Sequence, residues 1–244
     1  MPNNRVVSQE EWFAAHKAHL AREKELTRLR DAIAAERREL PWLKMRKDYV
    51  FETEQGPKRL ADLFKGRGQL IVYHFMQGPG NSHRCPGCAF LADHIDGAEQ
   101  HIRHHDVSLV VVSRAPLSEL LPYKRRMGWK FDWVSSYASD FNFDMQVSFT
   151  DRQIAEGDTT YNFEARPLQS RELPGASVFY RDEAGNIYLT FMVRARGGDA
   201  LIGAYHYLDL TPKGRNEDSR GMMSWMRLHD EYEGLEEIRE SCCR

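Results

Sequence analysis

The chain contains four cysteines, and they form two close pairs rather than being spread along the sequence. One pair is the C-x-x-C motif Cys85-Pro86-Gly87-Cys88, and the other is Cys242-Cys243. Four cysteines among 244 residues are too few for a disulfide-stapled fold. In a reducing compartment, a close pair is typical of thiol redox chemistry or of metal binding. The C-x-x-C motif is therefore the first candidate for chemistry.

The order of residues within this motif favours thiol–disulfide exchange. Pro86 suits the first turn of a helix, where its missing N–H is not needed, and this places Cys85 at or near the N-cap. The free backbone N–H groups and the positive end of the helix favour a thiolate there. Cys88 follows three residues later on the same helix face, so it can attack a mixed disulfide formed at Cys85. The two intervening residues, Pro86 and Gly87, influence the redox potential.

Two residues directly before the motif add positive charge. We expect Arg84 and His83 to favour the thiolate of Cys85 further. Cys85 is then the exposed nucleophile with a lowered pKa, and Cys88 is the more buried resolving thiol. This interpretation requires no cofactor, and it implies a disulfide-containing protein or a small thiol as the reaction partner.

A metal site is the alternative use of the same cysteines. A structural zinc site normally has four nitrogen or sulfur ligands, and one C-x-x-C supplies only two. Copper suits two thiolates and one imidazole. The ligand set would be Cys85 and Cys88 with His83 or His206, and His74 and His94 are further candidates. Copper or zinc would then be the cofactor.

The elements around the motif predict that it lies at the end of a buried strand. Residues 70–76 form a continuous apolar run of strand length, which is typical of a strand buried on both faces. A loop rich in Gly, Pro and Asn follows at 77–82, then the motif, and then a helical stretch from Ala89 to about His104. Residues 107–113 are a second buried strand. The order predicts a βαβ unit with parallel strands.

The remaining pattern predicts an α/β fold with a mixed sheet. Pro116 opens a helix that runs to about Met127, and residues 131–135 are a third parallel strand. Residues 177–180 and 187–193 flank a turn at 182–186, which predicts an antiparallel hairpin. Residues 140–173 show no assignable pattern. The end of the chain, from Met222 to Arg239, is expected to be helical.

The strand–CxxC–helix–strand order with a late hairpin resembles the thioredoxin fold. The chain is similar to a bacterial family of thioredoxin-like proteins, long catalogued as a domain of unknown function and described as predicted dithiol–disulfide oxidoreductases. The matching segments are 40–42, 73–76, 85–88, 205–212 and 225–230. The resemblance implies a thioredoxin-like fold with Cys85 and Cys88 as the redox pair.

Two features differ from an ordinary thioredoxin. The loop before Cys85 is longer, and we expect it to form a substrate lip or to shield the cysteines. A thioredoxin also carries a cis-proline just before the first hairpin strand, facing the cysteines, where it obstructs metal binding. Counting back from Gly185 puts Ala176 or Ser177 at that place and Pro174 too early. This count favours the metal alternative.

The first forty residues form a separate, highly charged helix. Ser8 and Glu11 fit a capping box, and Pro41 ends the segment. We expect a solvated helix laid over the core, and the alternative is a surface for a partner chain, including a second copy. The expected organisation is a helical extension at 1–41, a thioredoxin-like domain at 42–234 with a C-terminal helix, and a flexible tail at 235–244 that holds Cys242 and Cys243.

Composition limits the remaining functional classes. Lys plus Arg is 34 and Asp plus Glu is 36, which gives a formal charge of −2 and no basic excess for nucleic acid. Hydrophobic residues make up 41%, enough to build a core. No run is long and apolar enough to span a membrane, and the first residues lack the apolar stretch of a secretory signal. We expect a cytoplasmic protein that binds neither nucleic acid nor membrane.

Overall fold

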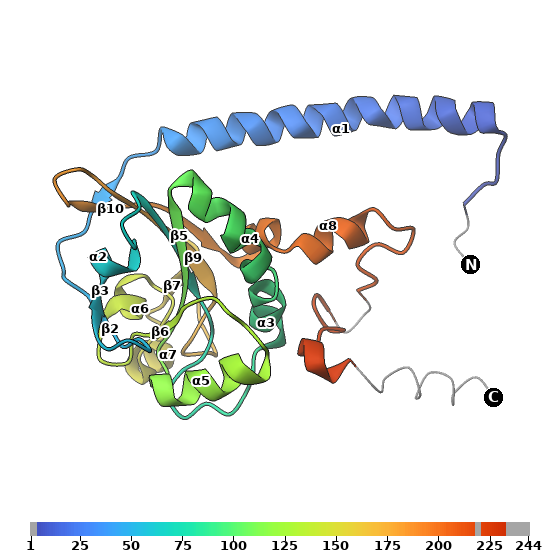
Figure 1. Cartoon of the computed structure of the whole chain (residues 1–244). Coiled ribbons are helices and arrows are strands. Elements are labelled where there is room, and N and C mark those ends of the chain that lie inside the picture. The colour runs from blue at the N-terminus through green and yellow to red at the C-terminus, as the bar shows by residue number, and fades with distance from the viewer. Residues whose placement is uncertain (1–3, 218–220, 233–244) are drawn as a thin grey trace, which may run out of the picture.

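A six-stranded mixed sheet lies at the centre of the protein. The computed structural model describes residues 4–217 and 221–232. The strand order is β1 (Leu43–Lys44), β10 (Ile187–Arg194), β9 (Gly175–Arg181), β4 (Gln69–His74), β5 (Val107–Ser113) and β6 (Trp133–Ser135). The pairs β4–β5 and β5–β6 are parallel, and the other three pairs are antiparallel. Helices cover the sheet, as Figure 1 shows.

The βαβ unit predicted around the cysteines is confirmed. Strand β4 pairs with β5 in parallel, from Gln69 opposite Val107 to His74 opposite Val112. Between them lie α3 (Pro86–Ala92), α4 (Ile95–Ile102) and the short 3₁₀ helix η1 (Arg103–His105). The single helix expected here is therefore two helices. The first ends with Asp93 as its C-cap, and His94 is the N-cap of the second.

Alternation along β4 divides the core into two layers, because successive side chains of a strand point to opposite faces. Tyr73 and Phe75 pack under α3 and α5 (Leu117–Arg126) with Trp133 and other aromatic rings. Leu70 and Val72 pack on the other face. That face is covered by β2 (Val50–Phe51), β3 (Lys58–Arg59), α2 (Leu60–Leu63) and α6 (Phe141–Asp144). Each fully buried aromatic ring contributes about 1.5–3 kcal/mol to folding.

The predicted hairpin is also confirmed, and it begins earlier than expected. Strand β9 starts at Gly175, two residues before Ser177, and Pro174 directly precedes it. The turn to β10 ends with Gly185 at φ 83°, a conformation that favours glycine. A βαβ unit followed by an antiparallel hairpin that packs beside its first strand is a thioredoxin-like arrangement, as expected.

Residues between β6 and β9, which the sequence left unassigned, form a small lobe. It holds α7 (Asp151–Glu156), β7 (Thr160–Tyr161) and β8 (Glu164–Ala165) around Phe149, Tyr161 and Leu168, whereas α6 packs on the sheet. The Tyr161 hydroxyl donates to the carbonyl of Pro174 at 2.7 Å and accepts the N–H of Ala195 at 3.0 Å. The lobe therefore fixes both ends of the hairpin.

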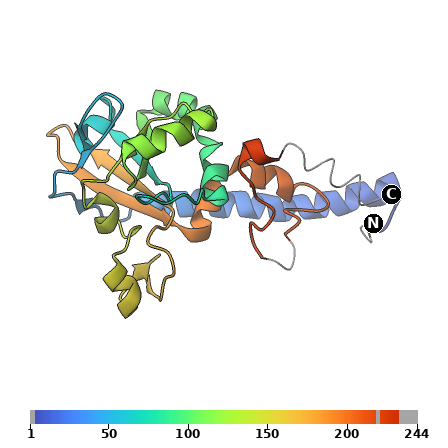
Figure 2. The same ribbon diagram turned by 90° about the horizontal axis from the view of Figure 1, so that it is seen from below.

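The N-terminal helix α1 (Gln9–Arg38) begins where the capping pattern predicted, with the Ser8 side chain accepting the N–H of Glu11 at 3.2 Å. The expectation that it lies over the core is wrong, because none of its residues is buried. Its outer part projects past the sheet (Figures 1 and 2). Near its C-terminal end, the Arg37 guanidinium lies 4.5 Å from the ring centre of Phe191 on β10.

The chain after the hairpin forms η2 (Ala195–Leu201) and α8 (Gly203–Asp209). His206, expected in a strand-like segment, lies on α8 and is exposed. The helix expected from Met222 to Arg239 is absent over 221–232, which consist of turns and the 3₁₀ helix η3 (His229–Glu231). Residues 233–244, including Cys242 and Cys243, lie outside the described residues. Among the described residues, no helix is long and apolar enough to cross a membrane.

Candidate functional site

The two cysteines of the motif lie at the start of α3, at the end of β4 and its loop. Cys85 is the N-cap residue, and Pro86 occupies the first turn, as predicted. The Cys85 sulfur accepts the backbone N–H of Cys88 at 3.3 Å. Cys85 is partly exposed, whereas the exposed fraction of Cys88 is 2%. Both are free thiols in this structure. Solvent thus reaches one sulfur of the pair much better than the other.

The electrostatic environments of the two thiols also differ, and they favour ionisation of Cys85 over ionisation of Cys88. The Cys88 thiol and the backbone N–H groups of Cys88 and Gly87 hydrogen-bond to Cys85 and hold the pKa of Cys85 below its ordinary value. Burial raises the pKa of Cys88 well above its ordinary value, and hydrogen bonds from the Met76 backbone and the Tyr73 hydroxyl oppose this rise. Cys85 is therefore the more accessible thiol with the lowered pKa, and Cys88 is the buried thiol with the raised pKa.

The expected source of the positive charge needs a correction. The Arg84 guanidinium lies 4.9 Å from the ring centre of Tyr123 and donates to the carbonyl of Asn81 at 2.8 Å. His83 is exposed, and its backbone N–H donates to the Asn81 side chain at 2.9 Å. The main causes of the lowered Cys85 pKa are hydrogen bonds from Cys88 and Gly87, rather than the charges of Arg84 and His83.

Two residues that the sequence analysis did not select lie against the cysteines. The Tyr73 hydroxyl is 3.4 Å from the carbonyl oxygen of Cys88, and its ring is buried. The Met76 sulfur is 4.0 Å from the Cys85 sulfur. The alternation of β4 would have indicated Tyr73, because it lies on the same face of the strand as Phe75, under α3. Met76 lies in the segment 73–76 that carries the family resemblance, but nothing in the sequence indicates that its sulfur contacts Cys85.

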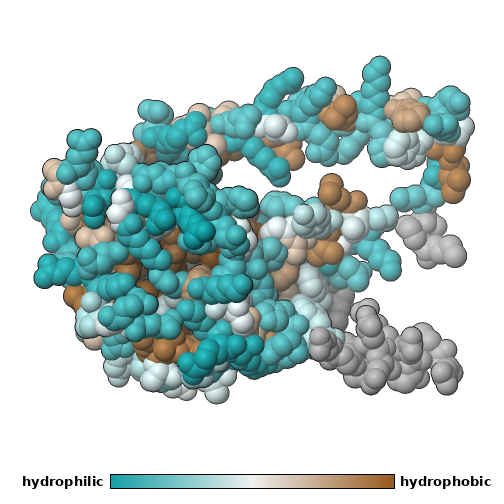
Figure 3. All heavy atoms as spheres, in the orientation of Figure 1, coloured by the Kyte–Doolittle hydropathy of each residue, from teal (hydrophilic) through white to brown (hydrophobic). Residues whose placement is uncertain are grey.

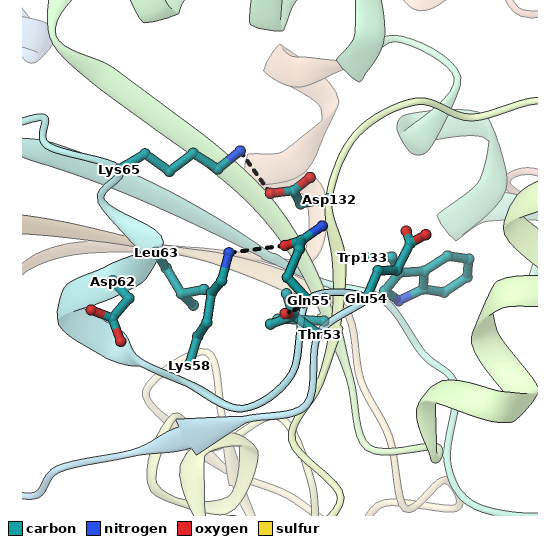
Figure 4. A pocket seen from close by; sticks show the side chains of 10 residues that line it. Thr53, Glu54, Gln55, Lys58, Asp62, Leu63, Lys65, Asp132 and Trp133 are labelled. Atoms are coloured by element: carbon teal, nitrogen blue, oxygen red, sulfur yellow. Dashed lines mark hydrogen bonds and ion pairs between the residues drawn. The ribbon is translucent and has the colours of Figure 1, made fainter.

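A cavity of about 360 Å³ opens beside the cysteines. Its walls come from β4, α3, the start of β9, the end of β10, η2 and the segment 222–223. Its apolar lining includes Met76, Cys85, Leu91, Val193, Leu201, Met222 and Met223. A second hollow, shown in Figure 4, lies between residues 53–65 and 132–134 and is bridged by Lys65 and Asp132 at 2.6 Å. At about 10 Å³ it has room for about one water molecule.

The position of Pro174 corrects the proline count. Pro174 lies directly before β9 and lines the cavity together with Cys85 and Cys88. The expectation that Ala176 or Ser177 occupies this place failed because the strand begins two residues earlier. A proline therefore lies beside the cysteines, nearer than the count placed it. No peptide bond among the described residues is cis, so the cis-proline of an ordinary thioredoxin is not present there.

The predicted metal ligands do not come together. Among residues 4–217 and 221–232, no three His, Cys, Asp or Glu side chains form a group that could hold a metal ion. His74 points to the opposite face of β4, stacks on Phe141 and contacts the Ser177 hydroxyl at 2.8 Å. His94 uses both ring nitrogens, with the Phe90 carbonyl at 2.7 Å and the Ala204 N–H at 3.0 Å. His83 and His206 are exposed.

The long loop before Cys85 packs away from the cavity. The N–H of Gly80 donates to the Glu119 carboxylate on α5 at 3.0 Å, and the Gln77 side chain closes the loop by donating to the Asn81 carbonyl at 2.6 Å. No residue of 77–84 lines the cavity. The loop thus does not form the expected substrate lip, because its hydrogen bonds hold it on the α5 side.

Several solved structures are similar in shape at low identity. They include peroxidoxin BcpB from Mycobacterium tuberculosis, with 14% identity, TM-score 0.42 and coverage of 66% of this chain and 94% of that one. A putative thiol:disulfide interchange protein DsbE from Chlorobium tepidum has 11% identity, TM-score 0.41 and coverage of 66% and 93%. The hypothetical protein SMc02350 from Sinorhizobium meliloti 1021 has 14% identity, TM-score 0.43 and coverage of 73% and 87%.

A search of the curated proteins gives no match. The family comparison matches residues 1–232 of the 244, which include α1, the C-x-x-C motif and the segment 221–232. The chain therefore belongs to the family described as "Bacterial protein of unknown function (DUF899)".

Proposed function

We propose that this protein is a thiol–disulfide oxidoreductase in which Cys85 is the nucleophile and Cys88 is the resolving thiol. The observation that carries the proposal is the asymmetry of the pair. Cys85 is partly exposed with hydrogen bonds that favour its thiolate, and Cys88 is buried beside it. A nucleophilic thiol must be accessible and ionised, whereas a resolving thiol needs only to reach its neighbour.

The reaction proceeds in two exchanges. The Cys85 thiolate forms a bond to one sulfur of a substrate disulfide, the substrate S–S bond breaks, and the second sulfur leaves as a thiolate that takes up a proton. Cys88 then loses its proton and attacks Cys85, which releases the first substrate sulfur as a thiol. The substrate gains two electrons, and Cys85 and Cys88 become a disulfide. A small thiol or a dithiol protein returns the electrons by the reverse exchanges.

Single cysteine substitutions test this assignment. Cys88→Ser is expected to accumulate a mixed disulfide at Cys85, because attack can occur but resolution cannot. Cys85→Ser is expected to form no mixed disulfide and to lose thiol exchange. Mass spectrometry of the protein after incubation with a disulfide substrate distinguishes the species. Full exchange activity of the Cys85→Ser protein would contradict the proposal.

The proposed reaction needs no metal or other cofactor, because the two thiols carry both electrons. Its partner is a disulfide-containing protein or a small thiol, and its setting is the reducing cytoplasm, where the pair is returned to the thiol form. Elemental analysis of protein purified without a tag and then reduced tests the cofactor claim. One equivalent of copper or zinc that protects both cysteines from alkylation would favour the metal alternative instead.

A further inference from the structure

The cavity beside Cys85 is larger than the exchange chemistry itself requires. Its volume of about 360 Å³ lies at the lower end of the range of roughly 300–1,000 Å³ that ligand pockets occupy. Two sulfur atoms in line with Cys85 would fill only a small part of it. The remaining space faces the side chains of Met76, Leu91, Val193 and Leu201. The shape and chemistry of the cavity therefore select the group that is attached to the substrate sulfur attacked by Cys85.

The charged residues that line the cavity are already engaged by other protein groups. The Arg194 guanidinium is buried and donates to the carbonyl oxygens of Met145 at 2.6 Å and Val193 at 3.0 Å. The Arg196 guanidinium pairs with the Asp199 carboxylate at 3.0 Å. Asp199 in turn pairs with Arg215 at 2.9 Å. A charged substituent would have to compete with these contacts, so the cavity favours an uncharged one.

Two methionines of the C-terminal segment form the outer wall. Both Met222 and Met223 line the cavity. Met223 packs over the motif so closely that a Cβ atom at Gly87 would lie 3.0 Å from its terminal methyl group. Met222 is half exposed at the rim, with an exposed fraction of 52%. Methionine side chains are unbranched and flexible, so they adapt to apolar groups of different shapes.

The segment that carries these methionines is fixed to the domain beyond them. The Trp225 and Phe90 rings pack edge to face with centres 5.6 Å apart, and Met226 and Leu228 are buried. The Arg126 guanidinium pairs with the Asp230 carboxylate at 2.7 Å. The wall is therefore a built part of the site.

We propose that this cavity is the subsite for an uncharged, apolar substituent of the disulfide that Cys85 attacks. The inference rests on the proposed exchange activity and adds the substrate class. The space suits an aliphatic or aromatic side chain next to a cysteine, or the alkyl group of a small disulfide. Substrates that present a carboxylate or a strongly hydrated group at this place are disfavoured.

Three peptide disulfides of nearly equal size test the subsite. They are the symmetric disulfides of N-acetyl-Leu-Cys-amide, N-acetyl-Asn-Cys-amide and N-acetyl-Asp-Cys-amide. Burial of a leucine side chain predicts that kcat/KM for the leucine peptide exceeds that for the asparagine peptide about tenfold or more. The aspartate peptide is expected to react most slowly. Equal rates for all three would overturn the subsite while leaving the exchange activity intact.

Variants at the rim connect this preference to the cavity. Met222→Glu and Leu201→Glu change half-exposed positions, with exposed fractions of 52% and 43%. Each is expected to bring the leucine-to-asparagine ratio of kcat/KM toward one. Leu210→Glu is the matched control, because Leu210 is 84% exposed and lies outside the cavity lining. A ratio that Met222→Glu and Leu201→Glu leave unchanged would contradict the assignment.

A small disulfide distinguishes the two sources of the apolar group. Rapid reduction of di-n-butyl disulfide, lost in Met222→Glu, supports an apolar subsite open to small molecules. Reaction with the leucine peptide alone supports a subsite that reads polypeptides. Failure of the proposed function would give a different result. No disulfide would then react, and no mixed disulfide would form at Cys85 in the Cys88→Ser protein.

Discussion

Cys85 and Cys88 belong to the same residue type, yet their surroundings give them different roles. The thiolate of Cys85 receives hydrogen bonds from the Cys88 thiol and from two backbone N–H groups. Cys88 is buried beneath it, and the Met76 backbone and the Tyr73 hydroxyl oppose the effect of burial on its pKa. The placement of Cys85 at the helix start followed from Pro86 alone. The neighbours of Cys88 could not be predicted from the motif, because they come from the preceding strand and its end.

The lowered pKa of Cys85 predicts the pH dependence of its alkylation. Iodoacetamide reacts with the thiolate, so the rate at Cys85 should rise with pH around a midpoint below that of an ordinary cysteine. The Cys88 thiol makes the largest contribution, and its hydrogen bond stabilises the charged form. Cys88→Ala should therefore raise the midpoint and slow the reaction at neutral pH. A midpoint unchanged in Cys88→Ala, measured by mass spectrometry over a pH series, would contradict this cause.

Tyr73 predicts a separate effect on the resolving step. Its hydroxyl lies 3.4 Å from the carbonyl oxygen of Cys88 and also opposes the raised pKa of the Cys88 thiol. Tyr73→Phe removes a hydrogen bond worth about 0.5–1.5 kcal/mol, so resolution should slow roughly two- to twelvefold. The pH at which resolution becomes fast should rise, because the pKa of Cys88 rises without this donor. Stopped-flow kinetics of mixed-disulfide decay measures both quantities.

Tyr123→Phe is the matched control for that experiment. Tyr123 is also buried near the cysteines, but its hydroxyl has no hydrogen-bond partner among the residues that the structure describes. Its loss should leave the decay rate and the pH profile unchanged, and the initial attack by Cys85 should be unaffected in both variants. Equal slowing in the two variants would show a packing effect rather than a role for the Tyr73 hydroxyl.

At the scale of elements, the sequence predicted what local patterns determine. Apolar runs identified β4 and β5, and the turn at Gly185 identified the hairpin. The segment 221–232 was wrongly expected to be helical, because its conformation depends on Trp225, Met226 and Leu228 packing against elements far away in the sequence. For the same reason the cavity was not predictable, since its walls come from five separate stretches of the chain.

Ion pairs near the end of the segment 221–232 are expected to hold it on the domain. Arg126 pairs with Asp230 at 2.7 Å and with Glu231 at 3.0 Å. Because these pairs are partly exposed, Arg126→Ala should cost no more than about 1 kcal/mol of global stability. Hydrogen exchange should nevertheless become faster within 221–232. Arg152→Ala, which breaks an exposed pair on α7, serves as the control and should leave that segment unchanged. Unaltered exchange in Arg126→Ala would contradict the anchoring role.

At the scale of the whole molecule, α1 is the element without a place in the core. It extends over 30 residues, and Figure 3 shows its outer part standing clear of the rest of the protein. Leu20, Leu26, Leu29 and Ile33 all expose large apolar side chains. An isolated helix of this kind gains little stability from its own turns and normally depends on packing. A partner chain therefore explains its exposed residues better than solvent does.

We propose that α1 joins two copies of the chain in an antiparallel pair. Its first turn is acidic, with Glu10 and Glu11, and its last turn is basic, with Arg37 and Arg38, so the ends of two antiparallel helices attract. Light scattering should give twice the chain mass of 28.4 kDa. The double substitution Leu26→Lys/Leu29→Lys should give the single mass without loss of thiol exchange. A single mass for the unaltered protein would refute the pairing.

The methionine wall of the cavity has a consequence under oxidative stress. Peroxide converts a methionine thioether into a sulfoxide, which is polar and more strongly hydrated. Met222, half exposed at the rim, is the most accessible of the wall methionines, and Met76 and Met223 lie deeper. Oxidation at Met222 would turn an apolar wall into a polar one while leaving both cysteines intact. Because sulfoxide reductases reverse this change, damage to the wall and damage to the thiols are repaired by different chemistry.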